Sequence, residues 1–175
     1  MVAEAAAAGV VHSREAAGAS EAAEPEDAGK AMSFFSSSPA IDHERVVNAV
    51  QAAERRTSGE IRVLIGRGKA EEPVPVAQAH FERLGMTKTA ERNGVLIFFA
   101  PRSHTFAIVG DTAIHAKCGQ DFWKLVASAM EIDFKRGAFT EGLVNGVGLV
   151  GSLLAEHFPR RTDDQNELPN RVEEG

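Results

Sequence analysis

The sequence predicts an α/β fold: a three-layer α/β/α sandwich in which a small mixed sheet has helices on both faces. Segments with helical spacing of apolar residues alternate with short apolar runs of strand length. Glycine, proline or small polar residues separate most of these segments. The length of 175 residues and an ordinary balance of apolar and charged residues fit one globular domain.

The first half of the domain is predicted to be a helix, a strand and a second helix. Asp42 can cap a helix that runs to about Arg56, because a short acceptor side chain satisfies free backbone N–H groups there. In residues 60–65, alternation places Ile61, Val63 and Ile65 on one side, which indicates a strand. After a loop with glycines and prolines, a helix is predicted over about 76–84, with Gly85 as its stop.

Two further strands follow. Residues 95–100 are apolar throughout, which predicts a central strand covered on both faces. A turn at 101–103 leads into a strand over 105–109, so these two strands should form an antiparallel hairpin. The strands at 60–65 and 95–100 are joined through a helix and should therefore be parallel.

From Thr112 onward the pattern is helical. We predict a short helical turn to about Lys117, a long helix near 121–136 and a last helix at about 140–157, for which Thr140 is a plausible cap. Trp123 is expected in the core. The residues of the long helix expected to face inward are Phe122, Leu125, Val126, Ala129 and Ile132.

The two ends differ in composition from the middle. Residues 1–31 are rich in Ala, Glu and Gly, so we predict a disordered N-terminal tail over 1–33, and Met32 is a possible natural start. Residues 160–175 are polar, and composition alone predicts a solvated C-terminal tail.

Composition excludes several classes of protein. The formal charge of −6 argues against a nucleic-acid partner, and no apolar stretch is long enough to span a membrane. Cys118 is the single cysteine and requires no oxidising compartment. The N-terminus has neither the apolar stretch of a secretory signal nor the acid-poor composition of a transit peptide, so we expect a cytoplasmic protein.

No complete catalytic motif is present, so the sequence leaves open whether the protein is an enzyme. Gly146, Gly148 and Gly151 match the spacing of a dinucleotide fingerprint, but they fall inside a helical pattern with no preceding strand. Close helix packing is the better interpretation. The six histidines include no pair at metal-ligand helical spacing.

Two places retain metal-binding chemistry. Asp111 stands just past a strand end, where a carboxylate could hold a divalent cation, or could simply cap the next helix. Residues 163–167 are dense in the oxygen donors that hard cations prefer, although they lack the spacing of an EF-hand loop and a solvated tail is the better interpretation of these residues alone.

Three phrases carry a resemblance to a known family. They are Thr57-Ser58-Gly59-Glu60-Ile61-Arg62-Val63, Arg92-Asn93-Gly94-Val95-Leu96-Ile97 and Phe106-Ala107-Ile108-Val109-Gly110-Asp111. Together they resemble the TPM domain, a small domain named for a thylakoid lumen protein, a photosystem repair factor and a receptor modulator. With the Asp-Asp-x-Asn-Glu-Leu-Pro run at 163–169, the chain looks most like short, stand-alone bacterial members.

This resemblance implies a TPM-like α/β domain over 34–159 and a C-terminal tail, 160–175, docked against it. It also implies the three-layer sandwich, and divalent-cation binding in some members. By the same resemblance Asp111 is a candidate metal ligand, with Glu60 and Asn93 as neighbours.

We therefore expect a divalent-cation-binding or interaction module that takes calcium or magnesium. Two alternatives remain open: a metal-assisted phosphatase, an activity attributed to plant relatives, and a metal-free scaffold that binds a protein partner. Arg92 stands where long members often have an aspartate, which weakens a transferred phosphatase assignment.

Overall fold

The computed structural model describes residues 5–10, 40–162, 166–169 and 171–175. Its elements in chain order are β1 (Ala5–Val10), α1 (His43–Glu54), β2 (Ile61–Ile65), α2 (Pro73–Arg83), the 3₁₀ helix η1 (Met86–Lys88), β3 (Val95–Ala100), β4 (Thr105–Gly110), α3 (Thr112–Lys135), α4 (Phe139–His157) and β5 (Val172–Glu174).

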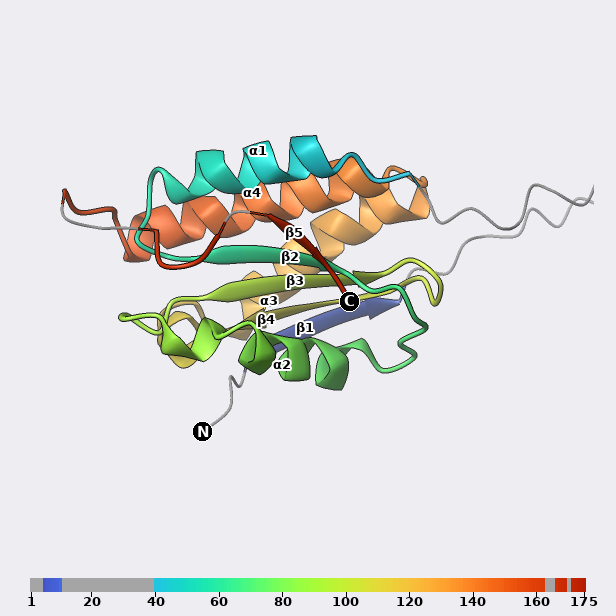
Figure 1. The fold of residues 1–175 in the computed structure, drawn as a ribbon, viewed down its shortest axis with the longest axis horizontal. Coiled ribbons are helices and arrows are strands. Elements are labelled where there is room, and N and C mark those ends of the chain that lie inside the picture. Colours follow the sequence, from blue (N-terminus) through green and yellow to red (C-terminus); the bar gives the residue numbers. More distant parts are fainter. Residues whose placement is uncertain (1–4, 11–39, 163–165, 170) are drawn as a thin grey trace, which may run out of the picture.

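One mixed sheet lies between two helical layers (Figure 1). Its strand order is β1-β4-β3-β2-β5. β2 and β3 are parallel and are joined through α2, whereas β3 and β4 form an antiparallel hairpin. The predicted α/β sandwich, the parallel pair and the hairpin are therefore confirmed.

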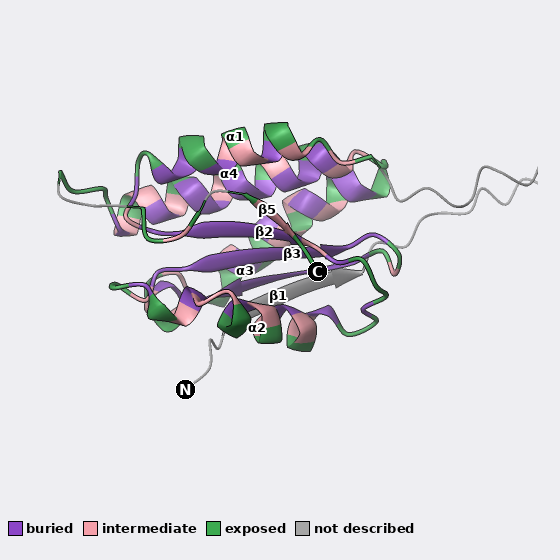
Figure 2. Cartoon of the chain, viewed as in Figure 1, coloured by how far each residue is buried: buried purple, intermediate pink, exposed green. Residues whose placement is uncertain are grey.

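The central strands are buried between the helical layers (Figure 2), and their alternating side chains build a core on each face of the sheet. Odd-numbered residues of β2 and β3, such as Val63 and Ile97, pack with α1, α3 and α4. Even-numbered residues, such as Leu64 and Phe98, pack with α2 and η1. Every residue of β3 is buried, as expected for a central strand covered on both faces.

The helix boundaries follow local signals with two corrections. Asp42 caps α1 by accepting from the Arg45 amide at 3.0 Å, and Gly85 follows α2 with a positive φ of 73°. α2, however, begins at Pro73, because proline is favoured in the first turn of a helix. Thr140 does not cap α4: it lies inside the helix, and its hydroxyl accepts from the Asp42 amide at 3.0 Å.

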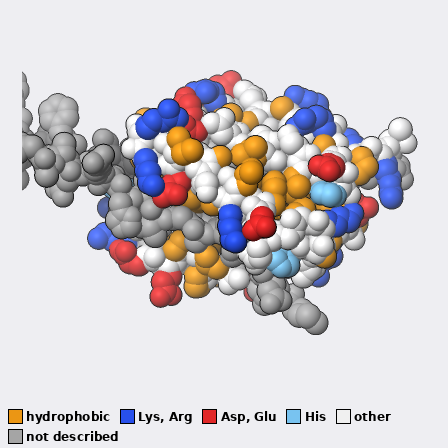
Figure 3. Space-filling view, turned by 180° about the vertical axis from the view of Figure 1, so that it is seen from behind, with side chains coloured by type: hydrophobic (Ala, Val, Ile, Leu, Met, Phe, Trp, Pro, Cys, Tyr) orange, Lys and Arg blue, Asp and Glu red, His pale blue; other side chains and the backbone are white. Residues whose placement is uncertain are grey.

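The prediction for α3 was correct for Trp123, which is fully buried, and wrong for two other residues. Leu125 and Ile132 are 57% and 59% exposed. The buried stripe is instead Trp123, Val126, Met130 and Phe134. On the side of the molecule opposite to the view of Figure 1, hydrophobic side chains gather among charged ones (Figure 3).

The glycines of α4 serve close packing. A Cβ at Gly146 would lie 2.5 Å from the Met130 sulfur of α3, and one at Gly151 would lie 2.5 Å from the Ala53 Cβ of α1. α4 can therefore fit between its two neighbouring helices because these positions lack side chains. Gly148 faces open space.

The N-terminal prediction needs one correction. Residues 5–10, expected in a disordered tail, form β1, which pairs antiparallel with β4. Their alanine-rich composition hid this strand, because sheet pairing uses main-chain groups that every residue carries. Residues 1–4 and 11–33 of the predicted tail lie outside the described residues.

The described part of the C-terminal segment lies against the domain. Leu168 packs against the core on the α2 face. Val172–Glu174 add a parallel strand beside β2, where the sequence pattern predicted only a polar tail. Within the described ranges, no helix has both the length and the apolar character that a membrane span requires.

Candidate functional site

The three predicted site residues lie at one end of the sheet, where β2 and β3 begin and β4 ends. The Val95 amide donates to the Glu60 carbonyl at 2.8 Å. The Asp111 amide donates to the Gly94 carbonyl at 2.9 Å. The pairing of the strands thus brings Glu60, Asn93 and Asp111 to the same end of the sheet. Their side chains, however, form three separate hydrogen-bond networks.

The Asp111 carboxylate forms an ion pair with the Arg92 guanidinium. Its side chain is fully buried, and Arg92 donates to both carboxylate oxygens, from Nε at 2.7 Å and from Nη2 at 2.8 Å. The same carboxylate caps α3 through the Thr112 amide at 2.6 Å. The hydrogen bond to Asp111 raises the pKa of the Arg92 guanidinium. Asp111 therefore acts here as a helix cap and ion-pair partner.

Glu60 holds the C-terminal segment. Its side chain is 3% exposed, and its Oε1 accepts from the Glu167 amide at 2.8 Å. The Glu167 carboxylate in turn accepts from the Ala90 amide at 3.1 Å. Burial raises the pKa of the Glu60 carboxyl, and the amides of Glu167 and Leu168 oppose that rise. Glu60 thus contributes to a docking contact at this end of the sheet.

Asn93 has an unused acceptor. Its side chain is 1% exposed, and its Nδ2 donates to the Ser58 hydroxyl at 3.2 Å and to the Glu91 carboxylate at 3.3 Å. Ser58 also donates to Glu91. Because a carboxylate can only accept, the amide nitrogen must face Glu91, and Oδ1 turns away. Within the described residues Asn93 Oδ1 is buried without a partner.

A cavity of about 320 Å³ opens beside this last network. Lys117 reaches across it, donating to the His157 carbonyl at 2.8 Å and lying 3.9 Å above the Phe158 ring. Glu91 lies 4.0 Å from the Arg161 guanidinium, so the wall carries both signs of charge. The lining residues are Glu91, Ala113, Lys117, His157, Phe158, Pro159 and Arg161.

Sequence reasoning missed this cavity and the Arg92–Asp111 pair. Residues 157–161 reach the cavity because the chain crosses back after α4, where Thr57 and Pro159 form an isolated β-bridge. No local signal marks that crossing. The Arg92–Asp111 pair did have one, because a hairpin places the residues before its first strand beside those after its second.

A preformed metal centre of the usual kind is not found in the part of the chain that the structure describes. There, no three His, Cys, Asp or Glu side chains converge as ligands. Of the acidic run at 163–167, Asp163, Asp164 and Gln165 lie outside the described residues. This end of the sheet does bring together three side chains that carry oxygen: Ser58, Glu91 and Asn93, the last of which turns its Nδ2 toward the other two.

Comparisons with known proteins agree with the fold and the motifs. A family model described as the TPM domain matches residues 33–153. The chain is similar to the NMR structure of BA42 protein from the psychrophilic bacterium Bizionia argentinensis, with 37% identity and a TM-score of 0.71. That match covers 82% of this chain and 98% of BA42. No curated protein matches the chain.

Proposed function

This chain belongs to the TPM domain family, and on that premise we propose that it is a divalent-cation-binding module whose site lies around Asn93, at the end of the sheet where β3 begins. One observation carries the proposal: among the described residues the Asn93 amide oxygen is buried without a partner, on a side chain whose Nδ2 contacts a carboxylate and a hydroxyl. An unpaired buried acceptor costs free energy, and a bound cation would remove that cost.

The donor set suits a hard cation. Once the Asn93 amide is rotated so that Oδ1 takes the place of Nδ2, Ser58, Glu91 and Asn93 would supply oxygens only, which calcium and magnesium prefer. Glu91 is 40% exposed, so its carboxylate can turn toward an ion without leaving a buried site. Waters would complete the coordination of either ion.

Asp111 and Glu60 would join the ligands only after giving up present partners. Arg92 occupies both oxygens of Asp111, and the Glu167 amide occupies Glu60. An Arg92→Ala variant tests the first of these directly. If calcium binds that variant more tightly than the wild type, Asp111 belongs to the ligand set; unchanged affinity leaves Asp111 as a structural residue.

An amide titration of the full chain with calcium and with magnesium tests the proposal. We expect localised, saturable shifts at Ser58, Glu91 and Asn93, and their loss in Asn93→Ala. Asn145→Ala is the matched control, because Asn145 on α4 also uses its Nδ2 for a carboxylate, that of Asp133. Diffuse shifts without saturation, or equal binding by Asn93→Ala, would overturn the proposal.

A metal-assisted phosphatase is the second candidate, and the cavity beside Glu91 is what favours it. Lys117 and Arg161 supply positive charge there for a phosphate ester, and a cation held near Asn93 could polarise a phosphoryl oxygen. Turnover of a phosphate monoester that needs added cation and disappears in Asn93→Ala and Lys117→Ala would support it. A rate unaffected by both changes would exclude this site.

A metal-free scaffold is the third candidate. The exposed side chains of Leu125 and Ile132 on α3 favour it, because a helix that presents apolar side chains to solvent can bind a partner. A thermal midpoint that neither calcium nor magnesium changes would favour this candidate over the first.

A further inference from the structure

The outer edge of β2 is built like a peptide-docking site. Val172–Glu174 lie parallel to it, with Val172, Glu173 and Glu174 in register with Val63, Leu64 and Ile65. The pairing continues past the strand: the Gly175 amide donates to the Ile65 carbonyl, and the Arg67 amide donates to the Gly175 carbonyl. Main-chain pairing of this kind does not depend on which side chains the added strand carries.

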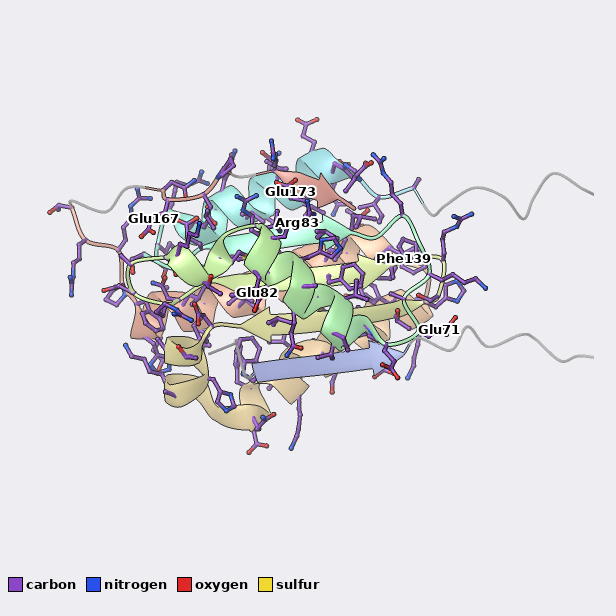
Figure 4. All side chains as sticks on the ribbon, turned by 60° about the horizontal axis from the view of Figure 1, so that its bottom comes forward. Glu71, Glu82, Arg83, Phe139, Glu167 and Glu173 are labelled. Carbon is purple, nitrogen blue, oxygen red and sulfur yellow. The ribbon has the colours of Figure 1, made fainter. Side chains whose placement is uncertain are left out.

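Side-chain contacts of this edge select for acidic residues. Glu173 accepts from Arg62 Nη1 at 2.8 Å, and Glu174 accepts from Arg67 Nη2 at 2.6 Å. Val172 packs against the core on the α1 face. The edge therefore accommodates an apolar residue followed by two carboxylates. Figure 4 labels Glu167 and Glu173, two residues of the C-terminal segment.

Arg62 is the feature that points beyond the chain's own segment. It is only 4% exposed, yet it lies on a strand whose neighbours in the core are apolar. Its Nε is buried without an acceptor among the described residues, while Nη1 alone bonds to Glu173. A guanidinium is best satisfied by a carboxylate that accepts from two nitrogens at once, and Glu173 does not provide this.

The strand that now occupies the edge is short, and one of its two ion pairs with β2 and the following loop is exposed. β5 has three residues, none fully buried. The Arg67–Glu174 pair is exposed on both sides, and ion pairs of this kind contribute at most about 1 kcal/mol. A peptide that pairs with the same main-chain groups, and whose carboxylate accepts from two nitrogens of the Arg62 guanidinium, would therefore bind this edge better than the chain itself does.

We propose that the outer edge of β2 is a docking site for an extended acidic strand of a partner protein, and that residues 171–175 occupy it in the free chain. The partner strand adds parallel to β2, places an apolar side chain at the Val172 position and places a carboxylate on Arg62. Because the chain's own segment is tethered, it competes at an effective concentration of the order of millimolar. The site is thus closed to weak acidic peptides and open to those that satisfy Arg62 fully.

Peptide binding to the full chain tests this proposal. The probe is a fluorescein-labelled octapeptide with the sequence of residues 168–175, followed by fluorescence anisotropy. In a Glu173→Ala/Glu174→Ala variant the chain's own segment is weakened, and we expect the peptide to bind about tenfold more tightly than it binds the wild type. Adding Arg62→Ala should remove that gain.

Two controls make the result specific. Arg45→Ala in the same background should leave binding unchanged, because Arg45 pairs with Glu141 between α1 and α4. A peptide with lysine in place of both glutamates should not bind. Equal binding of that peptide, or no binding by a variant with a native circular dichroism spectrum, overturns the proposal. A strand-exchanged dimer in a sizing experiment also overturns it, because the occupant would then be a second copy.

If the substituted chains do not fold, the wild type decides. In an NMR titration with unlabelled peptide raised well above the millimolar effective concentration of the tethered segment, the amides of Glu173 and Glu174 should move toward random-coil shifts while β3 amides stay in place. Unchanged signals from both glutamates at saturating peptide overturn the proposal.

Discussion

Asp111 illustrates how burial decides the role of a single carboxylate. It is fully buried, whereas its partner Arg92 is 41% exposed. Removing the arginine therefore leaves the buried Asp111 carboxylate without a counter-charge or contact with water. Neutralising the aspartate leaves an arginine that water can solvate. We expect Arg92→Ala to lower the free energy of unfolding by about 3 kcal/mol and Asp111→Asn by only about 1 kcal/mol. Urea unfolding of both variants measures the difference.

The order of these two effects is the test. Asp111→Asn keeps an acceptor for the Thr112 amide, so the cap of α3 survives. If Asp111→Asn proves more destabilising than Arg92→Ala, the capping contact rather than the ion pair dominates, and the burial argument is wrong.

How much of the candidate site the sequence could predict also depends on single residues. Glu60, Asn93 and Asp111 were predicted as neighbours, and the strand pairing does bring them to the same end of the sheet. Their partners were not predicted. Glu167 meets Glu60 across more than a hundred residues of chain, and such a contact leaves no periodic signal in the sequence.

Among the elements, the kink in α3 gives a contrast between two glycines. Gly119 has φ of 66° and ψ of −178°, a region that essentially only glycine occupies. Gly148 lies within α4, and a Cβ at either position would meet nothing within 4 Å. We expect Gly119→Ala to destabilise by about 1–3 kcal/mol and Gly148→Ala to stabilise by about 0.5–1 kcal/mol. Thermal unfolding of the two variants measures whether stability falls in Gly119→Ala and rises in Gly148→Ala.

Gly146→Ala separates packing from backbone strain. Its helical backbone favours alanine, but the new Cβ would lie 2.5 Å from the Met130 sulfur. We expect a net loss of about 1–3 kcal/mol from overpacking. A stabilised Gly146→Ala would mean that Met130 moves aside, and that the glycines of α4 are not required for close contact with α3.

Periodicity explains which elements the sequence could predict. β3 and β4 were found because apolar residues and turns mark them, and α1 because Asp42 caps it. β5 was missed because three residues with two glutamates carry no strand pattern; its pairing comes from the main chain and from arginines elsewhere. Leu125 and Ile132 were misplaced because helical spacing predicts an apolar stripe, not whether another element covers it.

At the scale of the whole molecule, the C-terminal segment links the two ends of β2. Glu167 anchors it beside Glu60, and Glu173 and Glu174 anchor it beside Arg62 and Arg67. Ionisation should therefore control whether the segment stays docked. The Glu60 contact and the contacts of Glu173 and Glu174 respond to pH in opposite senses, which makes the pH profile informative.

For Glu173, burial alone would raise the carboxyl pKa, but Arg171 and Arg62 outweigh burial and hold the pKa below its ordinary value of 4.5. The hydrogen bond from Arg67 lowers the pKa of Glu174 in the same way. Of the contacts that lower these pKa values, those with Arg62 and Arg67 exist only while the segment is docked; they stabilise the docked state above pH 4.5, and that stabilisation is lost as the pH falls through the lowered values. We expect the segment to undock over this acid range, which the amide shifts of residues 172–175 would report.

The control variant is Glu173→Gln/Glu174→Gln, in which neither side chain titrates. Its amide shifts at 172–175 should vary little between about pH 5 and pH 3, because the remaining contacts are main-chain hydrogen bonds. Glu60 has a raised pKa, so its protonation favours the docked state as the pH falls and cannot cause acid release. If the variant undocks over the same range as the wild type, Glu173 and Glu174 do not control docking, and general unfolding in acid accounts for the change.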